Sequence, residues 1–199
     1  MTPTCRPATN TDIDASFFAW GLNEAMDGFL DTMFGSRHQK IIATAARIPG
    51  HELSLDHVTV AEKDGQMIGM LSGMSTEAMA DATPALRRCA GLHILRAGLF
   101  YLAGWPVFGA MSRHTLGEWY LQAIAVSPAT RGSGVGSKLL AFAEKEAQRC
   151  GCNRITLDVV STNTGGIRLY ERLGYKREWT SSRAWLFGGV RVHRMSKAV

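Results

Sequence analysis

The feature of this sequence that most constrains its fold is the glycine-rich segment RGSGVGS at residues 131–137. An apolar run before it predicts a strand over Glu118–Val126, and an amphipathic pattern after it predicts a helix over Val135–Arg149. Unpaired amides at a helix N-terminus favour an anion, and glycines let the backbone approach a pyrophosphate closely. The segment therefore predicts a phosphate-binding loop.

Two familiar nucleotide-binding loops fit this segment less well. A P-loop ends in Gly-Lys-Ser/Thr, whereas here the lysine comes one place late, in Gly136-Ser137-Lys138. A dinucleotide-binding turn has G-x-G-x-x-G spacing directly after its strand, and here four residues intervene. Asp158 lies near the position of a ribose-binding acid, so a dinucleotide-binding oxidoreductase domain remains an alternative.

A second motif follows the predicted strand Arg154–Val160. Asn163 is a helix cap, the helix continues through Tyr170, and Gly174 is a left-handed stop. Two more strands, at about residues 175–180 and 190–195, complete the C-terminal half.

Together the two motifs carry a resemblance to a known family. IAVSP-x-x-RG-x-G-x-G at residues 124–136 resembles the strand and loop signature of the GNAT acetyltransferases, and N-x6-YE-x-x-GY at residues 163–175 is similar to that family's next segment. The match covers about residues 117–180. Gly165 and Gly166 depart from it, because small helix-forming residues such as alanine are usual there.

The resemblance implies both a fold and an activity. The fold would be mixed α/β, with a mostly antiparallel sheet that is splayed at the cofactor site and covered by helices on both faces. The enzyme would transfer acetyl directly from acetyl-CoA to a primary amine of a small molecule or of a peptide or protein. A non-catalytic acyl-CoA-binding sensor is the other alternative.

The resemblance also implies site residues. The pantetheine arm would pair with the strand before the loop, and Asn163 would bond that arm or cap its helix alone. Tyr170 would protonate the departing thiolate. The cofactor-binding set is then Ile124, Ala125, Val126, Arg131, Gly132, Ser133, Gly134, Val135, Gly136, Ser137 and Asn163.

The base that accepts the amine proton has several candidates. Glu118 lies near the start of the strand that leads to the loop, and two-residue alternation places Tyr120 on its face. Asp158 matches a carboxylate of the ribosomal-protein N-acetyltransferase branch. Otherwise a water chain serves, or the two carboxylates only bind a cationic substrate, and His114 is a further candidate for the base.

The N-terminal half predicts a short strand at residues 5–8, a helix capped at residues 10–12, and a hairpin at Asp64-Gly65. We expect one domain over residues 1–199 with a helical insertion at about 74–116. Leu92, Leu95, Leu99 and Leu102 recur there at helical spacing, which favours a homodimer surface or an acceptor lid over a membrane span.

A formal charge of +5 and a pI of about 9.2 favour an anionic partner. The basic residues are scattered, so CoA explains the charge better than nucleic acid. The four cysteines have neither zinc nor redox spacing, so no metal is expected. The first residues lack a secretory pattern, and cytoplasm is the expected location.

Overall fold

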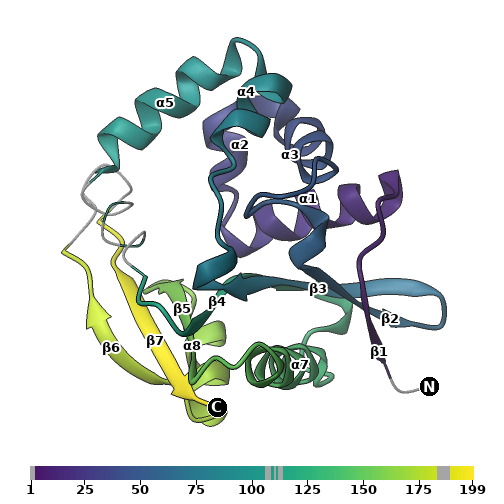
Figure 1. Cartoon of the computed structure of the whole chain (residues 1–199), viewed down its shortest axis with the longest axis vertical. Helices are drawn as coiled ribbons and strands as arrows, with labels where there is room; N and C mark the ends of the chain where they lie inside the picture. Colours follow the sequence, from purple (N-terminus) through teal and green to yellow (C-terminus); the bar gives the residue numbers. More distant parts are fainter. Residues whose placement is uncertain (1–2, 106–108, 110, 112–113, 183–188) are drawn as a thin grey trace.

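The computed structural model describes residues 3–105, 109, 111, 114–182 and 189–199. It contains both helices and strands (Figure 1). The strands are β1 (Thr4–Pro7), β2 (Val58–Lys63), β3 (Gln66–Ser75), β4 (Glu118–Val126), β5 (Arg154–Val160), β6 (Lys176–Thr180) and β7 (Val192–Ala198). The helices are α1 (Asp12–Ala25), α2 (Phe29–Phe34), α3 (His38–Ala46), α4 (Thr83–Ala90), α5 (His93–Ala103), α7 (Val135–Arg149) and α8 (Thr164–Arg172).

The strands form one sheet in the order β1-β2-β3-β4-β5-β7-β6. Every pairing is antiparallel except that of β4 with β5, which is parallel. This arrangement confirms the mostly antiparallel sheet expected from the sequence. It also excludes a doubly wound parallel sheet, the fold that a dinucleotide-binding domain requires.

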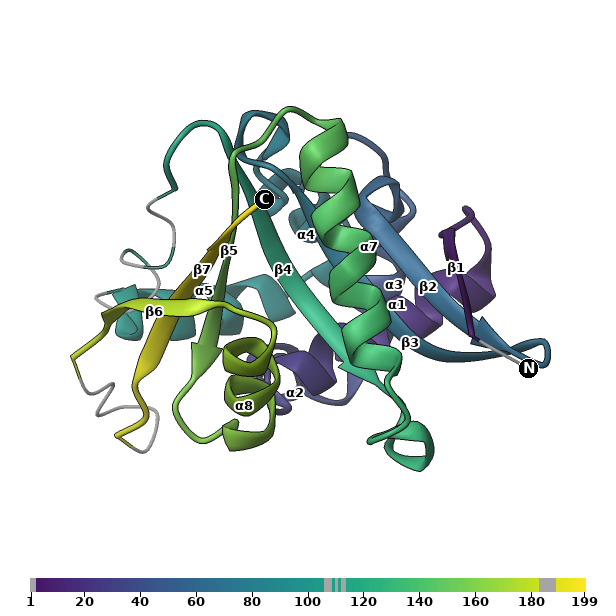
Figure 2. The same cartoon turned by 90° about the horizontal axis from the view of Figure 1, so that it is seen from below.

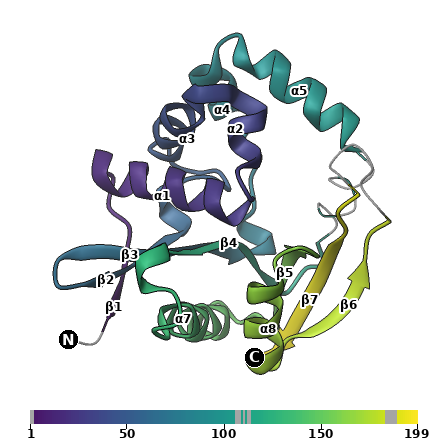
Figure 3. The same ribbon diagram turned by 180° about the vertical axis from the view of Figure 1, so that it is seen from behind.

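Helices cover both faces of the sheet, as Figure 3 shows. On one face α7 and α8 pack on a core that includes Leu139, Leu140 and Ile155. On the other, α1, α2 and α3 pack on a core around Phe18, Phe34 and Met70. In Figure 2 α7 lies in front of the sheet, on the first of these faces, and it contacts β3 and β4.

Local signals in the sequence explain several of these elements. The Asp64-Gly65 hairpin joins β2 to β3, and both residues have the positive φ of a tight turn, 52° and 75°. Thr11 caps α1 by accepting a hydrogen bond from the Asp14 amide. The expected strand and hairpin positions in the N-terminal half are confirmed.

The segment 74–116 contains the helices that were expected there, α4 and α5. Both lie on the same side of the sheet as α1, and α5 runs along the outer edge of the molecule (Figure 1). Residues 106–108, 110, 112 and 113 of this segment lie outside the described residues. In the part of the chain that is described, every helix is too short or too polar to cross a bilayer.

Candidate active site

The sheet opens between β4 and β5. The two strands pair only from Glu118–Arg154 to Leu121–Leu157, and beyond this point β4 keeps β3 as its neighbour while β5 keeps β7. At Ile124, Ala125 and Val126 the edge of β4 that faces β5 therefore has no strand partner in the described structure, although the Val126 carbonyl accepts a 3.2 Å hydrogen bond from the Arg131 side chain. An extended ligand could pair with such an edge like an added strand.

A bulge at Gln122 changes which side chains of β4 share a face. Ala123 pairs with Ser72, but Leu121 pairs with Gly73, so Gln122 is an extra residue in β4. Simple alternation along the whole strand is therefore wrong beyond Leu121. Glu118 and Tyr120 still share a face, as alternation predicts for that first part of the strand.

The glycine-rich loop lies at the open end of β4, directly before α7. Gly132 and Gly134 have φ of 80° and 86°, a region that favours glycine. In the described structure the amides of Gly134, Val135 and Gly136 donate to no protein acceptor. The positive end of α7 and these free amides together make a site for an anion such as a pyrophosphate.

A cavity of about 870 Å³ joins these features. Its walls are the open end of β4, the glycine-rich loop with the start of α7, the first turns of α8, and the turn between α1 and α2. The lining includes Ile124, Ala125, Val126, Arg131, Gly132, Gly134, Val135, Gly136, Ser137, Asn163 and Tyr170. All of the expected cofactor-binding residues except Ser133 line this one cavity.

Tyr170 forms part of the cavity wall from within α8. The residue is only 6% exposed, and burial raises the pKa of its hydroxyl to about 12. Its ring centroid lies 5.9 Å from that of Tyr175. The hydroxyl therefore stays protonated at neutral pH and can donate a proton or a hydrogen bond into the cavity.

Asn163 caps α8 in the way that the sequence predicts. Its side-chain oxygen accepts a hydrogen bond of 2.8 Å from the amide of Gly166. A Cβ atom at Gly166 would lie 2.9 Å from that same oxygen. A side chain at this position would therefore have to displace the Asn163 amide.

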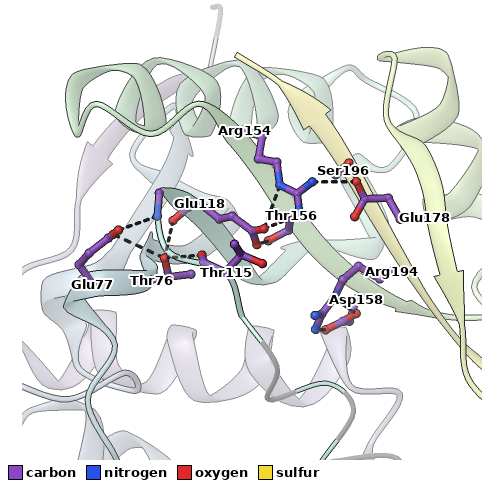
Figure 4. A network of polar contacts seen from close by, with 11 residues as sticks. Thr76, Glu77, Thr115, Glu118, Arg154, Thr156, Asp158, Glu178, Arg194 and Ser196 are labelled. Carbon is purple, nitrogen blue, oxygen red and sulfur yellow. Dashed lines mark hydrogen bonds and ion pairs between the residues drawn. The ribbon is translucent and has the colours of Figure 1, made fainter.

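Glu118 lies at the opposite end of β4 from the cavity. Its side chain is 3% exposed, and it accepts hydrogen bonds from the Arg154 guanidinium and, at 3.1 Å, from the Thr156 hydroxyl. Arg154 also contacts Glu178 at 3.0 Å, so the carboxylate belongs to a buried network (Figure 4). The structure does not bring Glu118 together with Tyr170.

Asp158 lies one residue past the last β4–β5 pair, where the sheet begins to open. Its two oxygens accept hydrogen bonds from Arg194 of β7 at 3.0 and 2.7 Å (Figure 4). The Tyr120 hydroxyl donates a third at 3.3 Å. The side chain points to the face that carries α1 and the insertion, because its neighbours Leu157 and Val159 pack on the other face.

The His114 ring packs against the ring of Tyr120, with the two centroids 4.4 Å apart and the planes tilted by 57°. Burial and the nearby Arg194 lower the pKa of His114, while burial and Asp158 raise that of Tyr120 well above its usual value. At neutral pH the histidine is therefore mostly uncharged and the tyrosine is protonated. Among the described residues, Nδ1 of His114 is buried without a hydrogen-bond partner.

The comparison with known families agrees with this geometry. A family model described as the acetyltransferase (GNAT) family matches residues 22–175. The chain belongs to the GNAT acetyltransferase family. This family is one of acetyltransferases.

Relatives of this GNAT chain match part of its length. Acetyltransferase Atu2258 of Agrobacterium fabrum is 40% identical over 72 residues, which are 36% of this chain and 51% of that protein. Mouse thialysine N-epsilon-acetyltransferase is 31% identical over 108 residues, 54% of this chain and 59% of that protein. The chain thus spans little more than half the length of these relatives.

Solved structures match nearly the whole GNAT chain. One crystal structure of an acetyltransferase has 25% identity and a TM-score of 0.68, covering 98% of this chain and 99% of the other. An N-acetyltransferase from Staphylococcus aureus Mu50 has 16% identity and a TM-score of 0.76, covering 98% and 100%. The second likeness concerns the fold alone.

The GNAT motifs gave no sign of the fourth cavity wall. Glu24 and Ala25 at the end of α1 and Asp27 in the turn after it line the cavity, more than a hundred residues before the glycine-rich loop. Asp27 has φ of 50° and stands before Gly28 at 77°. A non-glycine residue with positive φ is uncommon. The Asp27-Gly28 pair, typical of a turn, is the local sequence signal for this wall.

Proposed function

We propose that this GNAT chain transfers the acetyl group of acetyl-CoA directly to a primary amine. The observation that carries the proposal is that the glycine-rich loop, the open end of β4 and Tyr170 line one cavity. These are the three things that a thioester donor with a pyrophosphate needs. The fold of the family supports the same assignment.

In this proposal the loop from Arg131 to Ser137 holds the pyrophosphate. The amides at the start of α7 supply hydrogen bonds and the helix dipole supplies positive potential. Ile124, Ala125 and Val126 offer backbone groups to the pantetheine arm. Asn163 keeps the first turn of α8 in place, since its side-chain oxygen is already used in capping.

The reaction forms a C–N bond and breaks the C–S bond of the thioester. Tyr170 supplies a proton to the departing thiolate, and the proton is present at neutral pH because burial raises the pKa of the hydroxyl to about 12. The amine must reach the carbonyl uncharged and lose a proton as the bond forms. Both steps need a group that accepts a proton on the acceptor side.

We assign the acceptor side to the face where Asp158 points. Both carboxylates are buried and paired with an arginine, Glu118 with Arg154 and Asp158 with Arg194, but only Asp158 stands where the sheet opens. Asp158 is therefore the carboxylate that we propose to accept the amine proton, directly or through water. Glu118 takes a structural role in the same proposal.

The acceptor that we propose is cationic in its free form. Asp27 lines the cavity, where a carboxylate attracts an ammonium group, whereas the carboxylate of Glu24 is already paired with Arg131. Mouse thialysine N-epsilon-acetyltransferase, by its name, acts on the terminal amine of a lysine analogue. This suggests a flexible primary amine as the acceptor class for this chain.

The proposal is tested by incubating the chain with acetyl-CoA and a panel of amines, while free thiol is measured. The panel contains thialysine, polyamines, amino acids and peptides with a free N-terminus. Thiol release that depends on one class of amine supports the proposal. A folded protein that binds acetyl-CoA and releases no thiol with any amine would instead support an acyl-CoA sensor.

A further inference from the structure

Helix α5 exposes a line of leucines on the outer edge of the molecule. Leu92, which caps the helix, is 84% exposed, Leu95 is 67%, Leu99 is 70% and Leu102 is 74%. Tyr101 and Trp105 stand beside them, 43% and 57% exposed. Soluble monomers rarely expose a continuous apolar surface of this kind.

The opposite face of α5 is already occupied. Ala97 is 5% exposed, and Ile94 packs against the core shared with α1 to α3. The ring of Phe100 meets that of Phe29 edge to face, with centroids 6.3 Å apart. The leucines therefore cannot turn inward without breaking these contacts.

The spacing of the four leucines indicates what kind of surface covers them. They follow one another at three, four and three residues, which is the a/d spacing of a heptad. A strict a/d line is narrower than the apolar face of a helix on a globular core, and it fits a single partner helix. The line is short, so the partner helix needs only about three turns.

The spacing of three, four and three residues is the same from either end of the helix. A copy of α5 that runs antiparallel therefore places Leu92 opposite Leu102 and Leu95 opposite Leu99. A two-fold interface needs exactly such a self-complementary surface. Tyr101 and Trp105 stand beside the leucine line and would enlarge the contact.

The charges near the line allow this pairing. Arg96 is the one charged residue within α5, and its guanidinium lies over the Phe100 ring, 5.9 Å from the centroid, toward α2. Two copies would thus meet through leucines and keep their arginines to the side. Residues 82–117 contain no Asp or Glu, so the surface is basic as well as apolar and would also suit anionic lipid. Lipid binding does not require heptad spacing, so the spacing favours a partner helix.

We propose that this protein forms a two-fold homodimer in which α5 pairs antiparallel with α5 of a second copy. The contact lies outside the acetyl-CoA cavity, so the proposal does not depend on the transfer reaction. The proposal assigns the insertion at residues 74–116 a role in dimer contact.

Sedimentation of the full chain over a wide range of concentration tests the proposal. The wild type is expected to be a dimer that dissociates on dilution, and Leu95→Glu/Leu99→Glu is expected to be a monomer with an unchanged circular dichroism spectrum. Ile13→Glu is the matched control, because Ile13 is 70% exposed on α1, away from α5. The control is expected to dimerise like the wild type.

Cysteine cross-linking tests the direction of pairing and does not need the charged variant to fold. Antiparallel pairing predicts that a mixture of Leu95→Cys and Leu99→Cys chains cross-links several-fold more than either variant alone, above the background of the native cysteines. Stronger cross-linking of each variant with itself would show parallel pairing and overturn the arrangement. Equal background in all samples would overturn the contact.

Two further results would overturn the dimer. One is a wild type that stays monomeric at every concentration. The other is a monomer that sediments with vesicles containing phosphatidylglycerol, provided the double glutamate variant does not. That result would assign the leucine face to a lipid surface.

Discussion

The Arg131 guanidinium lies 3.0 Å from the carboxylate of Glu24, an ion pair that joins the end of α1 to the glycine-rich loop. Arg131 also donates a 3.2 Å hydrogen bond to the carbonyl of Val126, at the open end of β4. The pair therefore ties three walls of the cavity to one another. It also puts a negative charge beside the site that we assign to a pyrophosphate.

Glu24→Gln is expected to strengthen acetyl-CoA binding. The pair is well exposed, so losing it should change the free energy of unfolding by no more than about 1 kcal/mol. Removing the negative charge should raise affinity by about 2- to 5-fold at low salt, and less at high salt. Titration calorimetry at two salt concentrations measures this. Weaker binding of the variant would mean that the ion pair organises the loop.

Gly134→Ala is expected to weaken acetyl-CoA binding at least about tenfold, or ~1.4 kcal/mol. In the protein alone a Cβ atom there meets nothing within 4 Å, so the backbone φ of 86° is the main source of strain. Gly50→Ala is the matched control, with φ of 82° and equally open space outside the cavity. Both variants should lose ~1 kcal/mol of stability, but only the first should lose binding. Equal affinities would remove the loop from the site.

Tyr170→Phe is expected to lower turnover by about 10²- to 10⁴-fold and to leave acetyl-CoA affinity nearly unchanged. Because the pKa of Tyr170 is about 12, the loss should be the same at every pH between mild acid and mild base. Tyr175→Phe is the control. Its buried hydroxyl has no hydrogen-bond partner in the described structure, so its removal should cost little stability and no turnover. Equal rates for both variants would make Tyr170 a packing residue.

The elements that carry the two motifs could be predicted closely from the sequence. β4, α7 and β5 begin and end at the residues that periodicity indicates, because each is long and strongly patterned. Asn163 and Gly174 mark the two ends of α8 through capping chemistry alone. The bounds of an element could be predicted wherever they depend on the periodicity and capping residues of that element alone.

Features that depend on two distant segments could not be predicted in this way. The bulge at Gln122 depends on how β4 aligns with β3, and the sequence of β4 alone does not indicate it. Glu24 and Asp27 reach the cavity only because α1 crosses the sheet. The partners of Glu118 and Asp158, Arg154 and Arg194, likewise come from neighbouring strands.

Asp158→Asn and Glu118→Gln are expected to differ in what they lose. Each breaks a buried ion pair, so both should lower stability, by up to ~3–5 kcal/mol. If Asp158 accepts the amine proton, Asp158→Asn should also lower turnover per folded molecule and change the pH dependence of the rate. Glu118→Gln should keep the wild-type pH profile at a temperature where it is folded. A changed pH profile for Glu118→Gln and an unchanged one for Asp158→Asn would make Glu118 the proton acceptor and Asp158 the structural residue.

Direct transfer within the cavity is tested most closely by a single-turnover experiment with enzyme in excess over acetyl-CoA and with the best amine of the panel. Mass spectrometry follows the acetylated amine and the protein, while a thiol reagent follows free CoA. The account predicts that acetylated amine and thiol appear together at one rate, with no acetylated protein at any time. Thiol release before the amine is acetylated, or an acetyl group on the protein that then passes to the amine, would contradict it.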